Sequence, residues 1–119
     1  MRTGILQSLG ETTGLILAIP INGNTPLSAT QCLGQVVYST GANTVTLPIS
    51  VAGMSVTIYA VTAAIQTIAP GTGKRIILNG VSLGDNVSMT SDGTIGALVT
   101  LHSDSASGWV VVGKSGTWS

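Results

Sequence analysis

The sequence predicts an all-β fold: a single compact sandwich or barrel-like domain of short antiparallel strands, with an extended N-terminal arm. Three observations lead to this prediction. Short segments rich in Val, Ile and Thr recur at intervals of about 8–12 residues, a spacing typical of sandwiches and barrels. Gly, Asn, Asp, Pro or Ser bounds each segment and supplies the turns. No long stretch of the chain keeps the apolar pattern of a helix.

The composition restricts the partners that the chain can have. Of its 119 residues 7% are charged, against roughly 25% in an ordinary soluble domain, while 44% are hydrophobic. Four Lys+Arg balance four Asp+Glu, so the chain has no electrostatic footprint for nucleic acid or for an anionic membrane surface. Its single cysteine, Cys32, excludes an intrachain disulfide and a cysteine-based metal site. So few charges beside so much apolar surface predict an oligomer.

Residues 1–34 form the N-terminal arm, in which glycines and prolines interrupt short apolar clusters. The glycines recur too often for a helix. Leu15–Ile19 can form one short strand, which packs either on its own domain or on a neighbouring subunit or docking surface. This run is too short to cross a bilayer, and Glu11 argues against a signal peptide. We therefore expect a mature N-terminus made in a cytosol.

Residues 35–119 form the β-rich domain. In the segments around Val45 and Val56, apolar residues alternate with Thr, Ser and Tyr, which predicts one apolar face and one hydroxyl-bearing face. The last segment, Trp109–Val112, does not alternate, so we expect it to be covered on both faces by the core or by another subunit. The predicted strands are, in order, Gln35–Ser39, Thr44–Leu47, Met54–Val61, Ile65–Ile68, Arg75–Leu78, Asn86–Thr90, Gly96–His102 and Trp109–Val112.

Two dipeptides predict hairpins between these strands. Asn79-Gly80 follows Arg75–Leu78 and favours a type I′ turn, because both of its residues accept positive φ. Asp92-Gly93 stands in the same position between Asn86–Thr90 and Gly96–His102. No unit returns at a fixed period of about 20–50 residues, so the sequence does not predict a solenoid.

The residues that could carry chemistry do not form a catalytic or cofactor site, and we expect neither an enzyme nor a cofactor. Residues 70–75, PGTGKR, resemble the end of a phosphate-binding loop but lack its first glycine and the Ser or Thr after Lys. His102 lacks the positioned serine and acid of a triad, although three copies on a trimer axis could hold an ion. The carboxylates are scattered, and most of them stand beside turn residues. Cys32 is most simply a buried apolar residue.

The order of segments in the last two-thirds of the chain carries a family resemblance. Residues 44–48, TVTLP, and 51–58, VAGMSVTI, precede ILNG at 77–80 and GDNVSMTSDG at 84–93. The chain closes on GWVVVGKSGTW at 108–118, which is the most specific part. This order resembles the β-rich modules that tailed-bacteriophage virion proteins carry in tail fibres and in capsid-decorating proteins.

The resemblance implies a non-enzymatic, homotrimeric structural module on the exterior of a virion, made in the host cytoplasm. The short segment before the module favours a capsid decoration (cement) protein, which binds the major capsid protein at a threefold or quasi-threefold site and stabilises the shell. Neither nucleic acid nor a membrane is an expected partner. Docking is expected of the apolar residues between positions 5 and 21, which are Ile5, Leu6, Leu9, Leu15, Ile16, Leu17, Ile19 and Ile21. Module packing or subunit contacts are expected of Trp109, Val110, Val111, Val112 and Trp118.

A second interpretation of the same resemblance is a tail-fibre or receptor-binding head that recognises a host surface saccharide. Such a head binds sugar through exposed aromatic rings and polar loops. Four side chains of this chain could stack on a sugar, and two of them, Tyr38 and Tyr59, lie within predicted strands; the others are Trp109 and Trp118. A lectin-like or enzyme-associated module outside viruses is a third interpretation.

Overall fold

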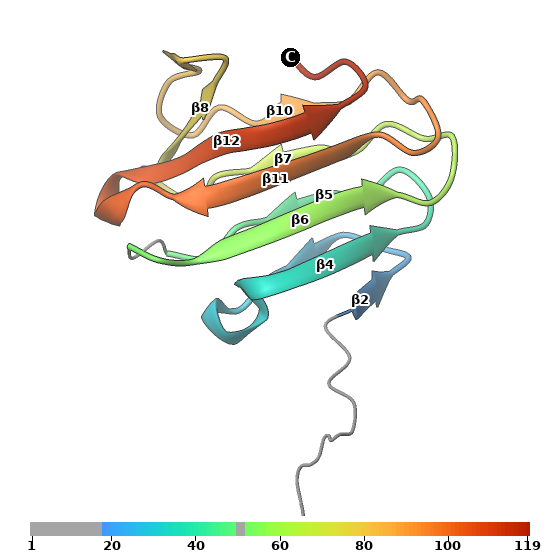
Figure 1. The fold of residues 1–119 in the computed structure, drawn as a ribbon, viewed down its shortest axis with the longest axis horizontal. Helices are drawn as coiled ribbons and strands as arrows, with labels where there is room; N and C mark the ends of the chain where they lie inside the picture. Colours follow the sequence, from blue (N-terminus) through green and yellow to red (C-terminus); the bar gives the residue numbers. More distant parts are fainter. Residues whose placement is uncertain (1–17, 50–51) are drawn as a thin grey trace, which may run out of the picture.

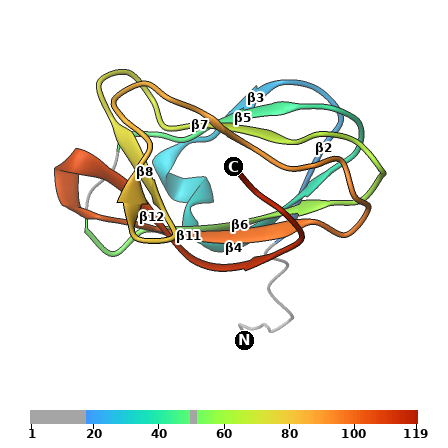
Figure 2. The same cartoon turned by 90° about the horizontal axis from the view of Figure 1, so that it is seen from above.

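Two β-sheets lie face to face and enclose one apolar core, as Figures 1 and 2 show. The computed structural model describes residues 18–49 and 52–119. In this part of the chain the helical segments are two short 3-10 turns, η1 (Ala29–Gln31) and η2 (Ser105–Ser107). The predicted all-β character is therefore confirmed.

Each sheet is built from short strands, and most neighbours within a sheet are not consecutive in the chain. The larger sheet has the order β2 (Ala18–Ile21), β4 (Leu33–Ser39), β6 (Ser55–Ala60), β11 (Leu98–Ser103), β12 (Gly108–Ser115), β8 (Arg75–Leu78) and β9 (Val81–Ser82). The smaller sheet has the order β10 (Met89–Thr90), β7 (Thr67–Ala69), β5 (Thr44–Thr46) and β3 (Thr25–Pro26).

The chain passes back and forth between the two sheets, and this winding sets most of the strand pairing. In the larger sheet β2, β4 and β6 lie side by side and parallel. The strands that follow each of them, β3, β5 and β7, lie side by side and parallel in the smaller sheet. A sheet of antiparallel strands is therefore a wrong prediction for this half of the molecule. Antiparallel pairing is found where β11 joins β6 and β12, and in the pairs β8–β9 and β7–β10.

The successive turns of the winding differ in length. In the larger sheet Ile21 pairs with Ser39 and Ser39 with Ala60, at separations of 18 and 21 residues. In the smaller sheet the separations from Thr25 to Val45 and from Val45 to Ile68 are 20 and 23 residues. Stacked parallel turns are the arrangement of a solenoid, but the unequal lengths leave no fixed period for the sequence to display.

The predicted strands all occur, with bounds that move by at most three residues. Arg75–Leu78 has the predicted bounds, whereas only Met89–Thr90 remains of the predicted strand Asn86–Thr90. That strand starts late because Asn86 adopts a φ of 65° and the Val87 N–H donates to the Gly84 carbonyl, which makes a turn.

One of the two predicted hairpins forms. Asn79 and Gly80 have φ of 55° and 78°, and they join Leu78 to Val81 in the antiparallel pair β8–β9, as a type I′ turn requires. The hairpin predicted at Asp92-Gly93 is wrong, because β10 pairs with β7 in the smaller sheet while β11 belongs to the larger one. There the Asp92 carboxylate accepts a hydrogen bond from the Thr94 N–H at 3.1 Å and turns the chain from one sheet to the other.

The alternation of apolar and polar residues in the sequence correctly predicts which side chains lie in the core. In β6, Val56, Ile58 and Ala60 are buried, while the intervening residues are half-buried on the outer face. Both tryptophans also belong to the core. The Trp118 Nε1 donates to the Ser115 carbonyl at 3.1 Å, whereas the fully buried Trp109 Nε1 has no hydrogen-bond partner within the described residues.

Residues 18–34 of the predicted N-terminal arm lie within the fold. They contribute β2, β3 and η1, and Ile21, Leu27 and Cys32 are buried in the core. The boundary predicted at residue 34 falls inside β4. Residues 1–17 of the arm lie outside the described part of the chain.

A buried glutamine joins the loops at one end of the two sheets. Gln66 is fully buried; its Oε1 accepts from the Ser39 hydroxyl at 2.5 Å, and its Nε2 donates to the Gly41 and Ala64 carbonyls at 2.9 and 3.1 Å. The Gln66 N–H donates to the hydroxyl of Ser91, which is also buried, at 2.8 Å. These bonds connect segments from three turns of the winding, so they fix how the turns stack.

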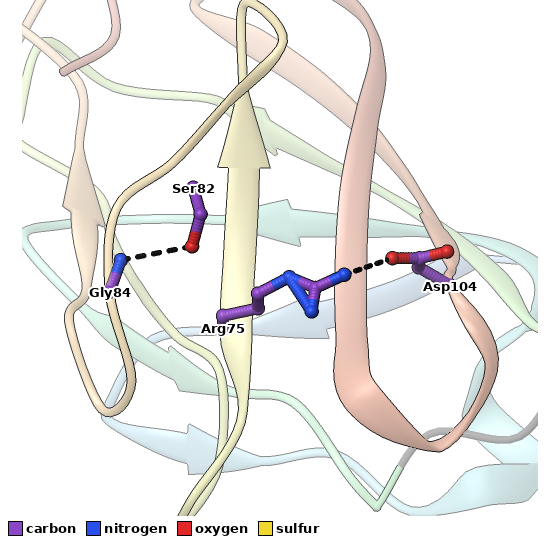
Figure 3. Close-up of polar contacts among 4 residues, drawn as sticks. All are labelled: Arg75, Ser82, Gly84 and Asp104. Carbon is purple, nitrogen blue, oxygen red and sulfur yellow. Dashed lines mark hydrogen bonds and ion pairs between the residues drawn. The ribbon is translucent and has the colours of Figure 1, made fainter.

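At the opposite end an ion pair accompanies a tight backbone approach (Figure 3). The Arg75 guanidinium donates to the Asp104 carboxylate at 2.6 Å, and Arg75 lies opposite Gly108 in the parallel pair β8–β12. Beside them the Gly84 N–H donates to the Ser82 hydroxyl at 3.2 Å. Gly108 has a φ of 149°, and a Cβ added there would overlap the Arg75 carbonyl oxygen. This position therefore requires glycine.

We expect Ser91→Ala to lower the free energy of unfolding by about 1–3 kcal/mol, because the buried Gln66 N–H loses its acceptor. Urea denaturation followed by far-UV circular dichroism measures the change. Ser88→Ala is the matched control, since Ser88 is exposed, and we expect it to stay within about 0.5 kcal/mol of the parent chain. Equal effects of the two variants would contradict the role given to the network.

We expect Gly108→Ala to destabilise the fold by more than about 4 kcal/mol, because its methyl group has no space between β8 and β12. The control is Gly113→Ala in the same strand, where an added Cβ meets no atom within 4 Å and φ is not positive. The two unfolding curves give the comparison. A Gly108→Ala variant as stable as Gly113→Ala would show that this backbone approach is not as tight as described.

Candidate interaction surface

Four neighbouring strands of the larger sheet carry no charged side chain. None of β2, β4, β6 and β11 contains Asp, Glu, Lys or Arg. The charged residues in the described part of the chain lie on β8, on β12 and in connecting segments; they are Lys74, Arg75, Asp85, Asp92, Asp104 and Lys114. The outer surface of the four strands is therefore a charge-free face, the composition expected of a contact surface.

A groove crosses the charge-free face and has two tyrosine rings in its lining. It measures about 420 Å³, and the rings of Tyr38 and Tyr59 lie 5.7 Å apart at an interplanar angle of 74°, an edge-to-face arrangement. The pairing of β4 with β6 places these two residues opposite each other. Val36, Thr57 and Leu98 complete the lining. We call this the tyrosine groove.

Three large apolar side chains are exposed in the loops where β6 ends and β11 begins (Figure 1), and we call Val61, Ile65 and Ile95 the loop-end cluster. Their exposed fractions run from 40% to 63%. The Gly96 N–H donates to the Ala60 carbonyl at 2.9 Å, so the residues next to Ile95 and Val61 are in contact. An added Cβ at Gly93, in the loop that carries Ile95, would touch the Ile65 side chain, so the two loops also meet there. The Gln66 bonds to Ala64 and Gly41 hold this end of the fold together.

The predicted docking and interface residues are found in different environments. Ile21, Trp109 and Trp118 are buried in the core, and Ile19 and Val111 are half-buried and pack against it. These five residues therefore contribute to the packing of the domain. Those that lie outside the described residues are Ile5, Leu6, Leu9, Leu15, Ile16 and Leu17.

The strand β12 is not covered on both faces within one chain, so of the two alternatives expected for Trp109–Val112 the core supplies only part of the cover. Val110 is half-buried and Val112 is 52% exposed. A bulge is the cause, because Thr100 pairs with Gly113 and Leu101 with Val111, which leaves Val112 between them without a partner in the ladder. Val112 remains available for a subunit contact.

The residues examined for chemistry lie apart. His102 is exposed on β11, while Asp104 is paired with Arg75. In the turn at 70–75 the Gly73 N–H donates to the Asn86 side-chain oxygen at 2.6 Å, so it is already bound. Over residues 18–49 and 52–119, no three His, Cys, Asp or Glu side chains lie where they could hold a metal ion. Nor does a helix of that part have the length and apolarity to cross a bilayer.

The tyrosine groove and the loop-end cluster were not among the predicted sites, although Tyr38 and Tyr59 were considered as sugar-stacking residues. Alternation within one strand shows that a side chain points outward, but the groove depends on which strands are neighbours. No family model matches the chain, and no curated protein matches it either. The surfaces described above are therefore the basis for the function proposed below.

Burial raises the pKa of the Cys32 thiol to about 11. We expect iodoacetamide at pH 8 to modify Cys32 in urea but not in the folded protein, where the thiol is protonated and covered. The unfolded thiol loses its proton first, so the contribution of Cys32 to stability is complete below about pH 8.5 and declines as the pH rises toward 11. Mass spectrometry after timed labelling measures the reaction, and labelling at the same rate in both states would contradict the burial.

Proposed function

We propose that the protein is a non-enzymatic structural protein of a tailed-bacteriophage virion, a capsid decoration (cement) protein. It binds the capsid exterior as a homotrimer, with the major capsid protein as its partner, and stabilises the shell. The residues that support this proposal are the closing segment at 108–118 and the order of segments before it. These segments support the virion assignment, and the exposed surfaces support the proposed assembly.

The observation that carries the proposal is the loop-end cluster. Val61, Ile65 and Ile95 are large, apolar and exposed at one end of the fold, beside a charge-free face. Exposing several apolar side chains to water does not stabilise an isolated monomer. Such side chains are commonly buried in subunit interfaces. We assign the contact between subunits to this cluster.

A threefold assembly fits this surface because the same cluster recurs once per subunit around an axis. Closed rotational symmetry lets each copy bury its cluster against its neighbours, and a trimer matches the symmetry of a threefold capsid site. The net charge of zero removes long-range repulsion between the copies. Docking on the capsid is assigned to the apolar residues between positions 5 and 17.

A second candidate function is that of a tail-fibre or receptor-binding head that recognises a saccharide. The observation that favours it is the tyrosine groove. Of the four aromatic side chains, the two tryptophans are buried, so Tyr38 and Tyr59 are the pair that remains able to stack on a sugar. Binding of the isolated protein to host cells, with competition by surface polysaccharide, would favour this function over capsid decoration.

We expect the protein to elute as a trimer at micromolar concentration in size-exclusion chromatography with light scattering, and Ile95→Asp to elute as a monomer. The introduced carboxylate would have to be buried without a partner in the subunit contact. Val81→Asp is the matched control, because Val81 and Ile95 are both 63% exposed but Val81 lies on β9 at the sheet edge. Circular dichroism is expected to show that both variants are folded.

The same variants test the role on the particle. Particles assembled with the parent chain or with Val81→Asp are expected to resist heat better than particles without the protein, and Ile95→Asp is expected to give no such protection. A parent chain that is a stable monomer would refute the proposed assembly. Equal heat resistance of particles with and without the protein would refute the cement function.

A further inference from the structure

We propose that the tyrosine groove is a binding site for a neutral saccharide. The site lies on the outer face of the larger sheet, and its lining shares no residue with the loop-end cluster to which the subunit contact is assigned. It rests on the second candidate function and deepens it, and it does not depend on the cement function, because its residues come from β4, β6 and β11 of a single chain. A groove of about 420 Å³ falls within the roughly 300–1,000 Å³ of small-molecule sites.

The strand register places the groups of the site on one surface. Tyr38 lies opposite Tyr59, and Leu98 lies opposite Tyr59 from the other side. Thr57 is two residues before Tyr59 on the same face and pairs with Thr100. Aromatic rings and hydroxyl groups are thus interleaved over three adjacent strands, so that a ligand lying across the strands would touch both.

The tyrosine rings supply apolar faces of the kind that the C–H groups of a sugar ring cover. An edge-to-face pair leaves ring faces open, whereas a stacked pair would cover them. Within the described residues neither the Tyr38 nor the Tyr59 hydroxyl has a hydrogen-bond partner, so both are free to donate to and accept from a ligand. A tyrosine therefore offers a sugar both its apolar side and a partner for its hydroxyls.

A pair of threonine hydroxyls adds polar groups beside the tyrosines: Thr57 lines the groove, and Thr100 is its cross-strand partner. The Thr57 and Thr100 Oγ1 atoms are 2.9 Å apart and share one hydrogen bond. One hydroxyl donates in that bond, so the pair retains one donor and several acceptor lone pairs for a ligand. Such a set suits a ligand with several hydroxyl groups, each of which both donates and accepts.

The absence of charge on the strands of the groove selects against ionic ligands. β4, β6 and β11 carry no Lys or Arg to pair with a phosphate, sulfate or carboxylate, and no Asp or Glu to pair with a cation. Aromatic platforms that bind single-stranded nucleic acid combine the rings with a positively charged groove, which these strands do not provide. A neutral polyhydroxylated ligand is the class that these groups fit.

The site is preorganised because its side chains stand on strands and not on loops. Val37, Ile58 and Val99 alternate with the outward-facing residues of β4, β6 and β11. All three are fully buried and anchor these strands in the core. Ser39, next to Tyr38, is held by its bond to Gln66. Binding therefore requires little ordering of the backbone, which lowers its entropic cost.

The test is a titration of the isotope-labelled protein with maltose, cellobiose and lactose, followed by amide chemical shifts, with sialyllactose as a charged ligand. We expect at least one of the three neutral disaccharides to shift the amides of β4, β6 and β11 with a dissociation constant of about 1 mM. Sialyllactose is expected to bind no better than lactose. No shift of these amides up to roughly 20 mM of each disaccharide would overturn the proposal.

Variants assign the binding to the groove. We expect Tyr38→Ala to weaken binding at least tenfold and Tyr38→Phe, which keeps the ring, to weaken it less. Thr57→Val is expected to weaken it severalfold, while the matched control Thr46→Val, a half-buried threonine of the smaller sheet, leaves it unchanged. If Tyr38→Ala does not fold, Tyr38→Phe and Thr57→Val decide the question. Affinity unchanged in Tyr38→Phe and Thr57→Val together would overturn the assignment.

The oligomeric state separates this proposal from the proposed function. Ile95→Asp is expected to bind the disaccharide as the parent chain does, whether or not it remains a trimer. One outcome refutes the saccharide site: no disaccharide binds the parent chain, and Tyr38→Ala converts its trimer to a monomer. In that case the groove is a contact between copies of the chain. A monomeric parent chain that binds the disaccharide would retain the saccharide site and refute the assembly.

Discussion

The buried side chain of Gln66 is the contact on which the stacking of the two sheets depends. Its amide joins Ser39 at the end of β4 to Gly41 in the next loop, and its backbone is paired with Ser91 beyond β10. A buried amide without partners is costly, so the arrangement is stable only when these segments are in place together. Ser39 and Gly41 belong to one turn of the winding, Gln66 to the next and Ser91 to a later one, so the network fixes these turns relative to one another.

The position of the tyrosine groove follows from the same constraint. Tyr38 precedes Ser39 in β4, and its place opposite Tyr59 is set by the β4–β6 register. A slip of one residue would turn Tyr38 toward the core and bring the buried Val37 to the surface. Thus the polar network at the sheet end and the apolar alternation along the strands favour the same register, and that register creates the groove.

Local features of the fold could be predicted from the sequence, and the pairing of distant segments could not. Asn79-Gly80 contains everything that a type I′ turn requires, so its hairpin was predictable. Asp92-Gly93 has a similar local signal, but β10 pairs with β7 and β11 pairs with β6, each more than 20 residues earlier in the chain, and these pairings place the two strands in different sheets. The burial of Gln66 could not be predicted from the sequence, because a glutamine next to a strand is usually solvated. The unequal turns of the winding concealed the solenoid-like stacking in the same way.

The distribution of charge explains how one small chain can present two kinds of contact. The charged side chains of the described residues lie on β8, β12 and the connecting segments, where Arg75 and Asp104 pair beside the tight approach at Gly108. The strands of the charge-free face carry hydroxyl groups instead, and a hydroxyl can leave water at lower cost than an ionised group when a ligand offers it a hydrogen bond. A neutral, hydroxyl-rich partner can therefore bind the sheet face, while the exposed Val61, Ile65 and Ile95 favour an apolar one at the loop end. The two surfaces therefore differ in chemistry and share no lining residue, so each favours its own class of partner.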